Sequence, residues 1–264
     1  MATYNLTAAQ LKEGGILNSF EIPAVGSFTN VYSVDFDGVD DYIDCGDNDN
    51  LSFGDGSTDS PFSISTWVKL NITYNSTSAS LIEKIESTEY EFALLFYNSK
   101  IYFALYDSVL STRVVRYYNT GLSSYSNQWL HICATYDGQG GSTAYNGMKV
   151  YLNGTQIDDT SWTTGGYTAM HNTSANVFMS GERYKLNGNL DEASIFNSEL
   201  SASDITAIYN SGTPQSLDSY SSLVSWWRMG DGDTYPTLTD NGSGGNNGTM
   251  TNMVSGDIVT DVPT

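Results

Sequence analysis

Aspartates that flank apolar, strand-like runs are the first residues in this sequence with a recognisable chemistry. Calcium takes about six to eight oxygen ligands, and a carboxylate at a strand end beside a Gly-rich turn can supply some of them. The sequence predicts a bound, structural calcium ion, with these candidate ligands: Asp37, Asp191, Asp231 and Asp240, with Asp40, Asp41 and Asp233 close by in the sequence. A simpler alternative is that Asp37 and Asp40 only form turns.

Aromatic side chains gather in two segments that are predicted to be loops, "DDTSWTTGGYTAMHNTS" and "GERYKLNG". Saccharides are bound by aromatic rings that stack on the sugar, together with polar groups that bond its hydroxyls. The sequence therefore predicts a ligand-binding rim made of Trp162, Tyr167, His171, Arg183 and Tyr184. The alternative is that each ring anchors its own loop. The tyrosines of "RYYNTGLSSYSNQW" instead favour packing pairs between strands.

Catalytic signals are weak. The two histidines are His131, which alternates with Trp129 and Cys133 in a strand-like run, and His171, which is placed in a loop. This alternation favours a packed histidine over a catalytic base. The sequence has no H-E-x-x-H motif, no G-x-S-x-G motif and no cysteine cluster. We therefore expect that this protein is not an enzyme.

The charge of the chain limits its partners. Its 264 residues include 10 Lys and Arg against 30 Asp and Glu, a formal net charge of −20. Such a chain has few cations for phosphate contacts, so nucleic acid and anionic membranes are not expected partners. The acidity agrees with solubility in a salty medium as well as with cation binding. The first residues lack a signal-peptide pattern, and no window is apolar for long enough to span a bilayer.

Short alternating segments must position these residues. From residue 31 onward, runs such as "FSISTWVKL" and "KIYFALYD" are separated by Gly, Asn and Asp turns, and "MKVYLNGTQI" leads into an Asn-Gly hairpin turn. In "FSISTWVKL" one face takes the following side chains: Phe62, Ile64, Thr66 and Val68. Cys45 and Cys133 lie in such runs and are expected to be buried and unpaired. The pattern predicts an all-β, two-sheet antiparallel jelly-roll sandwich.

Two segments depart from the strand pattern. "SASDITAIYNSG" predicts one short C-terminal helix, capped by Ser201 or Ser203 and ended by Gly212. Residues 1–30 predict an N-terminal arm with a short helix after Thr7. We expect this arm to attach to another protein.

In order along the chain, four motifs together resemble the concanavalin A-like, laminin G-like jelly-roll domains: "VDFDGVDDYIDCGD", "FSISTWVKL", "QWLHICATYDG…MKVYLNGTQI" and "GNLDEASIFNSELSASDITAIYN". The resemblance covers residues 31–212. It implies two curved antiparallel sheets that bind sugars or proteins and often hold calcium. It also makes Asp191 and the loop of Asp240 the favoured calcium ligands. Glycosidases of this fold carry an E-x-D-x-x-E motif, which is absent here.

The segment "SWWRMGDGDTYPTLTDNGSGGNNGTM" comes after the predicted helix, although in the resembled family such a segment comes first. One interpretation is a single domain over residues 31–264, in which residues 222–254 supply a permuted first strand and its loop. The other is a truncated second repeat whose strand is donated to a neighbour. We favour the single domain, because an orphan strand bearing Trp226 and Trp227 would expose an apolar edge.

The style of the sequence resembles virion surface proteins of tailed, particularly marine, bacteriophages. This resemblance implies a non-catalytic decoration or adhesion module in the virion, assembled in the host cytoplasm. It would bind glycans or a host surface and would contact other virion proteins through residues 1–30. A homotrimer would suit this role. The alternatives are a bacterial glycan-binding adhesin at the cell surface and, less favoured, a concanavalin A-like glycosidase.

Overall fold

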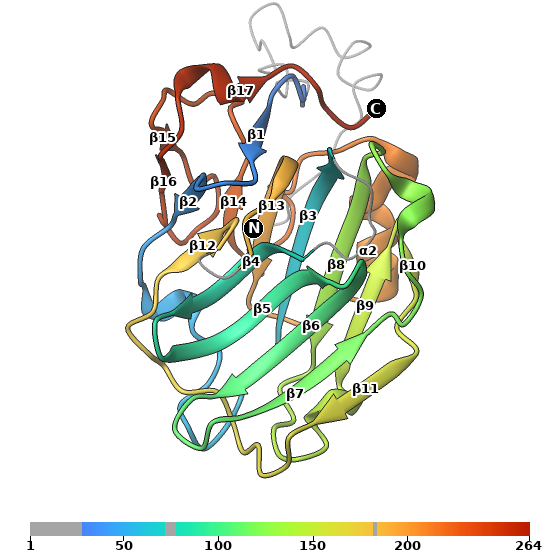
Figure 1. The fold of residues 1–264 in the computed structure, drawn as a ribbon, viewed down its shortest axis with the longest axis vertical. Coiled ribbons are helices and arrows are strands. Elements are labelled where there is room, and N and C mark those ends of the chain that lie inside the picture. The colour runs from blue at the N-terminus through green and yellow to red at the C-terminus, as the bar shows by residue number, and fades with distance from the viewer. Residues whose placement is uncertain (1–27, 72–77, 182–183) are drawn as a thin grey trace, which may run out of the picture.

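Two antiparallel sheets packed face to face form the molecule (Figure 1). The computed structural model describes residues 28–71, 78–181 and 184–264. The two packed antiparallel sheets confirm the predicted all-β jelly-roll sandwich. The predicted arm over residues 1–30 lies outside the described residues except for its last three positions, and so does the short helix after Thr7.

The first sheet has eight strands. In spatial order they are β10 (Thr155–Gln156), β9 (Met148–Leu152), β8 (Leu130–Tyr136), β3 (Phe62–Leu70), β13 (Asn187–Phe196), β1 (Ser33–Asp37) and β17 (Ile258–Val259), while β14 (Leu223–Trp227) also pairs with β13. The N-terminal and C-terminal strands therefore meet on one side of the sandwich, where β1 pairs with β17 (Figure 1).

The second sheet has nine strands and lies in front of the first in Figure 1. In spatial order they are β11 (Thr160–Thr163), β7 (Thr112–Tyr117), β6 (Lys100–Asp107), β5 (Glu89–Tyr97), β4 (Ala79–Glu86), β12 (Val177–Met179), β2 (Tyr42–Asp44), β16 (Gly248–Thr251) and β15 (Thr237–Leu238). Four of these strands, β4 to β7, follow one another as a meander of hairpins.

Helical structure is sparse in the described part of the chain. It comprises α2 (Ala202–Tyr209) and five 3-10 turns: η1 (Asp49–Leu51), η2 (Ser123–Tyr125), η3 (Ala144–Asn146), η4 (Asn210–Gly212) and η5 (Ser255–Asp257). Among the described residues, no helix has both the length and the apolar character that a membrane span requires.

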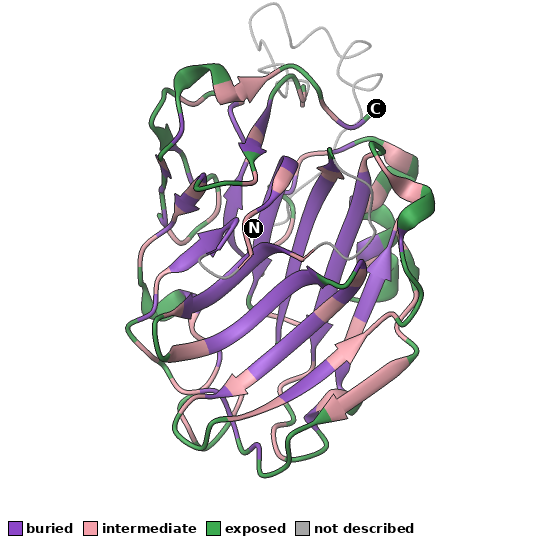
Figure 2. Cartoon of the chain, viewed as in Figure 1, coloured by how far each residue is buried: buried purple, intermediate pink, exposed green. Residues whose placement is uncertain are grey.

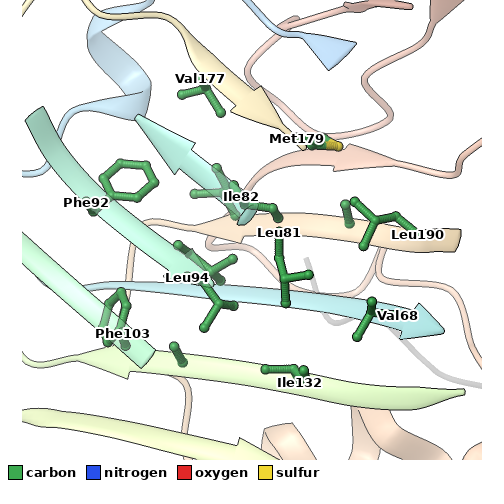
Figure 3. Packing of buried hydrophobic residues seen from close by; sticks show 14 of the residues in the cluster. Val68, Leu81, Ile82, Phe92, Leu94, Phe103, Ile132, Val177, Met179 and Leu190 are labelled. Carbon is green, nitrogen blue, oxygen red and sulfur yellow. The ribbon is translucent and has the colours of Figure 1, made fainter. Parts of the chain in front are cut away.

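Period-two alternation builds the core between the sheets. Phe62, Ile64 and Val68 of β3 point into the main hydrophobic cluster, as predicted. Figure 3 shows Val68 and neighbouring apolar side chains of both sheets meeting in this layer. On the opposite face of β3, Ser65 Oγ lies 2.8 Å from His131 Nε2, and Trp67 stacks on the ring of Tyr209.

Buried titratable groups outside any groove behave as structural residues. His131 is fully buried, and burial lowers its pKa to about 3, so this histidine is neutral in the folded protein. The prediction of a packed histidine is therefore confirmed. Cys45 and Cys133 are buried and free, as predicted, and burial raises the pKa of both thiols.

Helix α2 covers the outer face of the eight-stranded sheet. Its Ile205 and Ile208 pack with Leu223 and Trp226 of β14 in a second hydrophobic cluster. Ser201 caps the helix through a capping box with Asp204, as one of the predicted alternatives required. The predicted end at Gly212 is wrong, because Asn210 takes the left-handed conformation (φ 44°) that terminates the helix earlier.

The tryptophan strand β14 belongs to the same sandwich as the other described strands. It pairs antiparallel with β13, and all five of its residues are buried. The alternation of this strand predicts Leu223, Trp227 and Met229 on one face and Val224 and Trp226 on the other. This division is wrong at two positions, because Val224 joins Trp227 in the main core and Leu223 joins Trp226 in the cluster under α2. The reason is a register shift between Ile195 and Phe196 of β13, which leaves one extra residue on β14 and interrupts the alternation.

Candidate functional site

A groove crosses the outer face of the nine-stranded sheet from β4 to β11. Its volume is about 570 Å³. It is lined by Glu83 and Ile85 of β4, Leu95 and Tyr97 of β5, Tyr102, Ala104 and Tyr106 of β6, Arg113 and Val115 of β7, Trp162 of β11, and Tyr184. Figure 2 shows that the middle of this sheet is largely buried, whereas β11 at its edge is only partly covered.

The alternation of β6 explains why the sequence makes a groove at this place. Ile101, Phe103 and Leu105 point inward to the main core, so Tyr102, Ala104 and Tyr106 must point outward. The small side chain of Ala104 lies between two tyrosines and leaves room on the floor. The neighbouring strand β5 contributes Leu95 to the same outer face.

Tyrosine rings support one another around this floor. The rings of Tyr97 and Tyr102 meet edge to face with centroids 5.6 Å apart, and Tyr184 lies 5.9 Å from Tyr97. Tyr102 also stacks on Tyr117 of β7 at 4.5 Å, which confirms the predicted packing role of Tyr117. Because the rings hold one another in place, their faces and hydroxyls are ordered before any ligand arrives.

The two ends of the groove differ in charge. At the β11 end the guanidinium carbon of Arg113 lies 4.7 Å from the centre of the Trp162 ring. At the β4 end Glu83 is almost fully buried, and its Oε2 accepts a hydrogen bond of 2.6 Å from Ser80 Oγ. Among the described lining residues, Glu83 is the one carboxylate.

Two of the five predicted ligand-binding residues, Trp162 and Tyr184, line this groove. The prediction for Tyr167 as an exposed rim residue is wrong, because its ring is 2% exposed and its hydroxyl donates to Asp59 Oδ2 at 2.7 Å. His171 is not among the residues that line the groove; its Nε2 lies 3.3 Å from Asp107 Oδ1. Arg183 lies outside the described residues.

The site residues that sequence reasoning missed are Tyr97, Tyr102, Tyr106 and Arg113. They lie on strands, whereas the prediction looked for binding residues in loops. The available signal was the stretch "IYFALY" at residues 101–106, in which one face is Ile, Phe and Leu and the other is Tyr, Ala and Tyr. A strand with one apolar face and one aromatic, hydroxyl-bearing face can serve the core and a ligand at once.

The four aspartates predicted as calcium ligands do not form one cluster among the described residues. Asp191 is fully buried on β13, where Oδ2 accepts from Asn30 Nδ2 at 2.7 Å. Burial, with the nearby Glu192 carboxylate, raises the pKa of Asp191 well above its ordinary value. Asp231 Oδ2 accepts from the backbone N–H of Val31 at 2.9 Å. Both carboxylates thus fasten residues 30–32 to the sandwich.

Asp240 has a third role, in the polar loop that follows β14. Its Oδ1 accepts from the backbone N–H groups of Trp226 and Gly242, and its Oδ2 accepts from that of Asn246, each at 2.8 Å. Trp227 Nε1 in turn donates to the carbonyl of Asn246 at 2.7 Å. The loop therefore satisfies the backbone and indole groups of the tryptophan strand.

Asp37 is the one predicted ligand that has carboxylate neighbours. Its oxygens lie within 4.8 Å of those of Asp40 and Asp41, and this is the one such group in the described part of the chain. Asp37 Oδ1 also accepts from the backbone N–H of Val39 at 2.7 Å, so the turn-forming role is present too. These turn hydrogen bonds lower the pKa of Asp37, which keeps it ionised.

Comparison with known proteins places the fold. Residues 37–206 match the family model Laminin_G_3, described as the concanavalin A-like lectin/glucanases superfamily. No curated protein sequence matches the chain. A Bacteroides ovatus protein, provisionally described as carbohydrate-binding, is similar in structure, with a TM-score of 0.60, 14% identity and coverage of 89% of this chain and 62% of its own.

A second similar structure is the receptor binding domain of botulinum neurotoxin D. Its TM-score is 0.50 at 22% identity, with 70% of this chain and 44% of the other covered. The match therefore spans less than two thirds of the length of either solved structure. At 14% and 22% sequence identity, these similarities show that the proteins share a fold and nothing more.

Proposed function

The chain belongs to the concanavalin A-like lectin/glucanase superfamily, and we propose that it is a non-catalytic module that binds glycans in the groove between β4 and β11. The observation that carries this proposal is the set of partly exposed aromatic rings around a hollow of about 570 Å³. Aromatic faces stack on the C–H faces of sugar rings, and tyrosine hydroxyls and a guanidinium bond their hydroxyl groups. The description of the Bacteroides ovatus relative as carbohydrate-binding supports the same class of ligand.

A glycosidase is the rival function. Hydrolysis by the common two-carboxylate mechanism needs an acid and a second carboxylate about 5–10 Å apart on either side of the scissile bond. The described lining residues offer Glu83, at one end of the groove and engaged by Ser80. This arrangement favours binding without cleavage.

Replacement of a groove tyrosine should weaken glycan binding without loss of the fold. We take a glycan that the wild type binds on an array, and we expect Tyr97→Ala to lower the affinity for it by about tenfold. The reason is that stacking of a sugar ring on an aromatic ring contributes on the order of 1 kcal/mol to the free energy of binding. Tyr97 is 40% exposed, so its removal should change the unfolding temperature little. Tyr184→Ala, at the same end of the ring cluster, should act in the same direction.

Tyr32→Ala is the matched control, since Tyr32 is 37% exposed and lies just before β1, outside the groove. Affinity should be measured by calorimetry and stability by thermal unfolding for all three variants. Equal losses of affinity in the control and the groove variants would contradict the assigned site. A wild-type protein that binds nothing on a broad glycan array would contradict the proposed function itself.

We further propose, on the style of the sequence, that the module is displayed on a bacteriophage virion as a decoration or adhesion protein. Residues 1–30 would then contact other virion proteins, and a homotrimer would suit this setting. Mass spectrometry of purified phage particles tests this role directly. Detection of the protein at bacterial cell surfaces and not in particles would favour the adhesin alternative.

Calcium remains a proposal, now at Asp37, Asp40 and Asp41, whose clustered carboxylate oxygens are suitable ligands for this ion. We expect saturating calcium to raise the unfolding temperature relative to chelator, because an ion that binds only the folded state stabilises it. Asp40→Asn should reduce this difference, whereas Asp240→Asn should leave it unchanged although it destabilises the loop. Identical melting in calcium and in chelator would end the calcium proposal.

A further inference from the structure

Arg113 differs from the other arginines in the described part of this acidic chain. In the described part of the chain, Lys69, Lys84, Arg116, Lys149 and Arg228 all form ion pairs with carboxylates. Arg113 forms none, although the chain has thirty acids for ten Lys and Arg residues. Its Nε is buried and has no hydrogen-bond partner. Among the described residues no carboxylate neutralises this guanidinium, which lines the groove, so an anionic group that accepts from its terminal N–H groups would be bound favourably at this position.

The position of Arg113 is fixed before any ligand binds. Its guanidinium lies over the Trp162 ring at 4.7 Å, and its backbone N–H and carbonyl bond Thr164 and Thr163 across the β7–β11 pair. A guanidinium held over a ring keeps its edge free for a planar acceptor, and carboxylates and sulfates match that edge with two oxygens.

A second hollow of about 450 Å³ adjoins the groove at Arg113 and Tyr106. It is lined by hydroxyl groups from Thr88, Ser108, Ser111, Thr112 and Thr164. Asp107 also lines it, but its Oδ1 already accepts a hydrogen bond from the backbone N–H of Leu110 at 3.0 Å. The same oxygen lies 3.3 Å from Nε2 of His171. The junction at Arg113 therefore offers donors for an anion.

The opposite end of the groove holds the buried side chain of Glu83 and, among the described lining residues, no cationic side chain. Glu83 is on β4, and three strand spacings separate β4 from β7, a distance of roughly 14 Å. The groove thus presents a carboxylate at one end and an unpaired guanidinium at the other. Most other Asp and Glu side chains of the protein lie on its surface. Solvent and salt screen their charges beyond about 8 Å, so they act only weakly on a ligand in the groove.

We propose that the groove takes an acidic saccharide, whose carboxylate or sulfate group is bound by Arg113 beside Trp162 while its neutral rings stack on the tyrosines toward β4. This inference rests on the proposed function, since it names the ligand class of the same groove. The position of Arg113 sets one orientation, because Arg113 is the one cationic side chain among the described residues that line the groove.

The test compares ligands that differ only in charge. The carboxylate arm uses oligogalacturonate against its methyl ester, and the sulfate arm uses a carrageenan oligosaccharide against its desulfated form, on an array that also carries unrelated neutral glycans. The proteins are the wild type, Arg113→Gln, Arg113→Lys and a control, Lys100→Gln. The Lys100→Gln variant removes one positive charge from the neighbouring strand β6. The Nζ atom of Lys100 donates to Asn119 outside the groove.

We expect the wild type to prefer at least one charged member of a pair by about tenfold or more, as for hydrogen bonds to charged groups. Arg113→Gln should abolish this preference, Arg113→Lys should keep part of it, and Lys100→Gln should keep all of it. Equal binding of charged and neutral partners, or a preference unchanged in Arg113→Gln, overturns the inference and leaves glycan binding standing. Absence of binding to every glycan overturns the inference together with the proposed function.

Discussion

Deletion of residues 222–264 is expected to unfold the domain completely. The deletion removes β14, which pairs with β13, together with β15, β16, β17 and the loop of Asp240. Trp227 and Met229 are fully buried in the main core, and Trp226 is 3% exposed in the cluster under α2. Loss of one buried Trp alone costs about 3–5 kcal/mol, whereas a whole domain has a net stability of roughly 5–15 kcal/mol.

The measurement is cooperative unfolding by circular dichroism and urea for the full chain and for a chain ending at Ser221. A single replacement tests the same point with a smaller change. Trp227→Ala should lower the free energy of unfolding by several kcal/mol, because it empties a buried site and removes the hydrogen bond that the indole donates to the Asn246 carbonyl. Trp162→Ala is the matched control, since this Trp is only partly buried on the edge strand β11. A soluble, monomeric and cooperatively folded truncation would contradict the result and support the truncated-repeat interpretation.

Replacement of Lys84 by Met is expected to be the most destabilising single charge removal. Lys84 is fully buried on β4, and its Nζ lies 2.6 Å from Asp47 and 3.5 Å from Glu91. The side chain of Glu91 is fully buried as well. Removal of one partner from a buried ion pair leaves the other charge uncompensated and costs about 3–5 kcal/mol. We expect a loss of this size at pH 8.

The loss should be smaller at pH 5. Burial raises the pKa of Glu91 from 4.5 to about 7, with Lys84 as the main opposing influence. The contribution of Glu91 to stability is therefore complete below pH 4.5 and is lost as the pH rises through about 7. At pH 5 the folded protein holds Glu91 largely protonated, so Lys84 then neutralises Asp47 alone.

Urea unfolding of the wild type, Lys84→Met and the double variant Lys84→Met with Glu91→Gln, at pH 5 and pH 8, tests this account. The double variant should show much less difference between the two pH values, because it has no carboxyl group at position 91. The pH responses of Glu192 and His131 are common to all three proteins and cancel in the comparison. A Lys84→Met loss that is the same at both pH values would contradict the role given to Glu91.

Local pattern was sufficient for much of the fold. The alternation of "FSISTWVKL" predicted correctly that Phe62, Ile64 and Val68 face the core, because a strand has only two faces and one of them must be apolar. The capping box at Ser201 was likewise visible, since its two partners lie three residues apart in the sequence. The motif order from residue 37 to residue 206 was enough to indicate the family.

Contacts between distant segments decided what the sequence could not. The role of Asp240 depends on a loop that folds back on β14, and the role of Asp191 depends on Asn30, which lies 161 positions away. The facing of Val224 depends on a register shift relative to β13, because strand register is set by the partner and not by the strand itself.

The candidate site shows the same division. The sequence by itself determined that Tyr102, Ala104 and Tyr106 share one face of a strand, because side chains alternate with a period of two. Only the tertiary structure decided that this face is completed by Arg113 and Trp162 from two other strands. It also buried Tyr167, whose hydroxyl finds Asp59 from a segment 108 residues away. Residues on separate strands become one site only when pairing brings them together, and a single sequence does not record which strands pair.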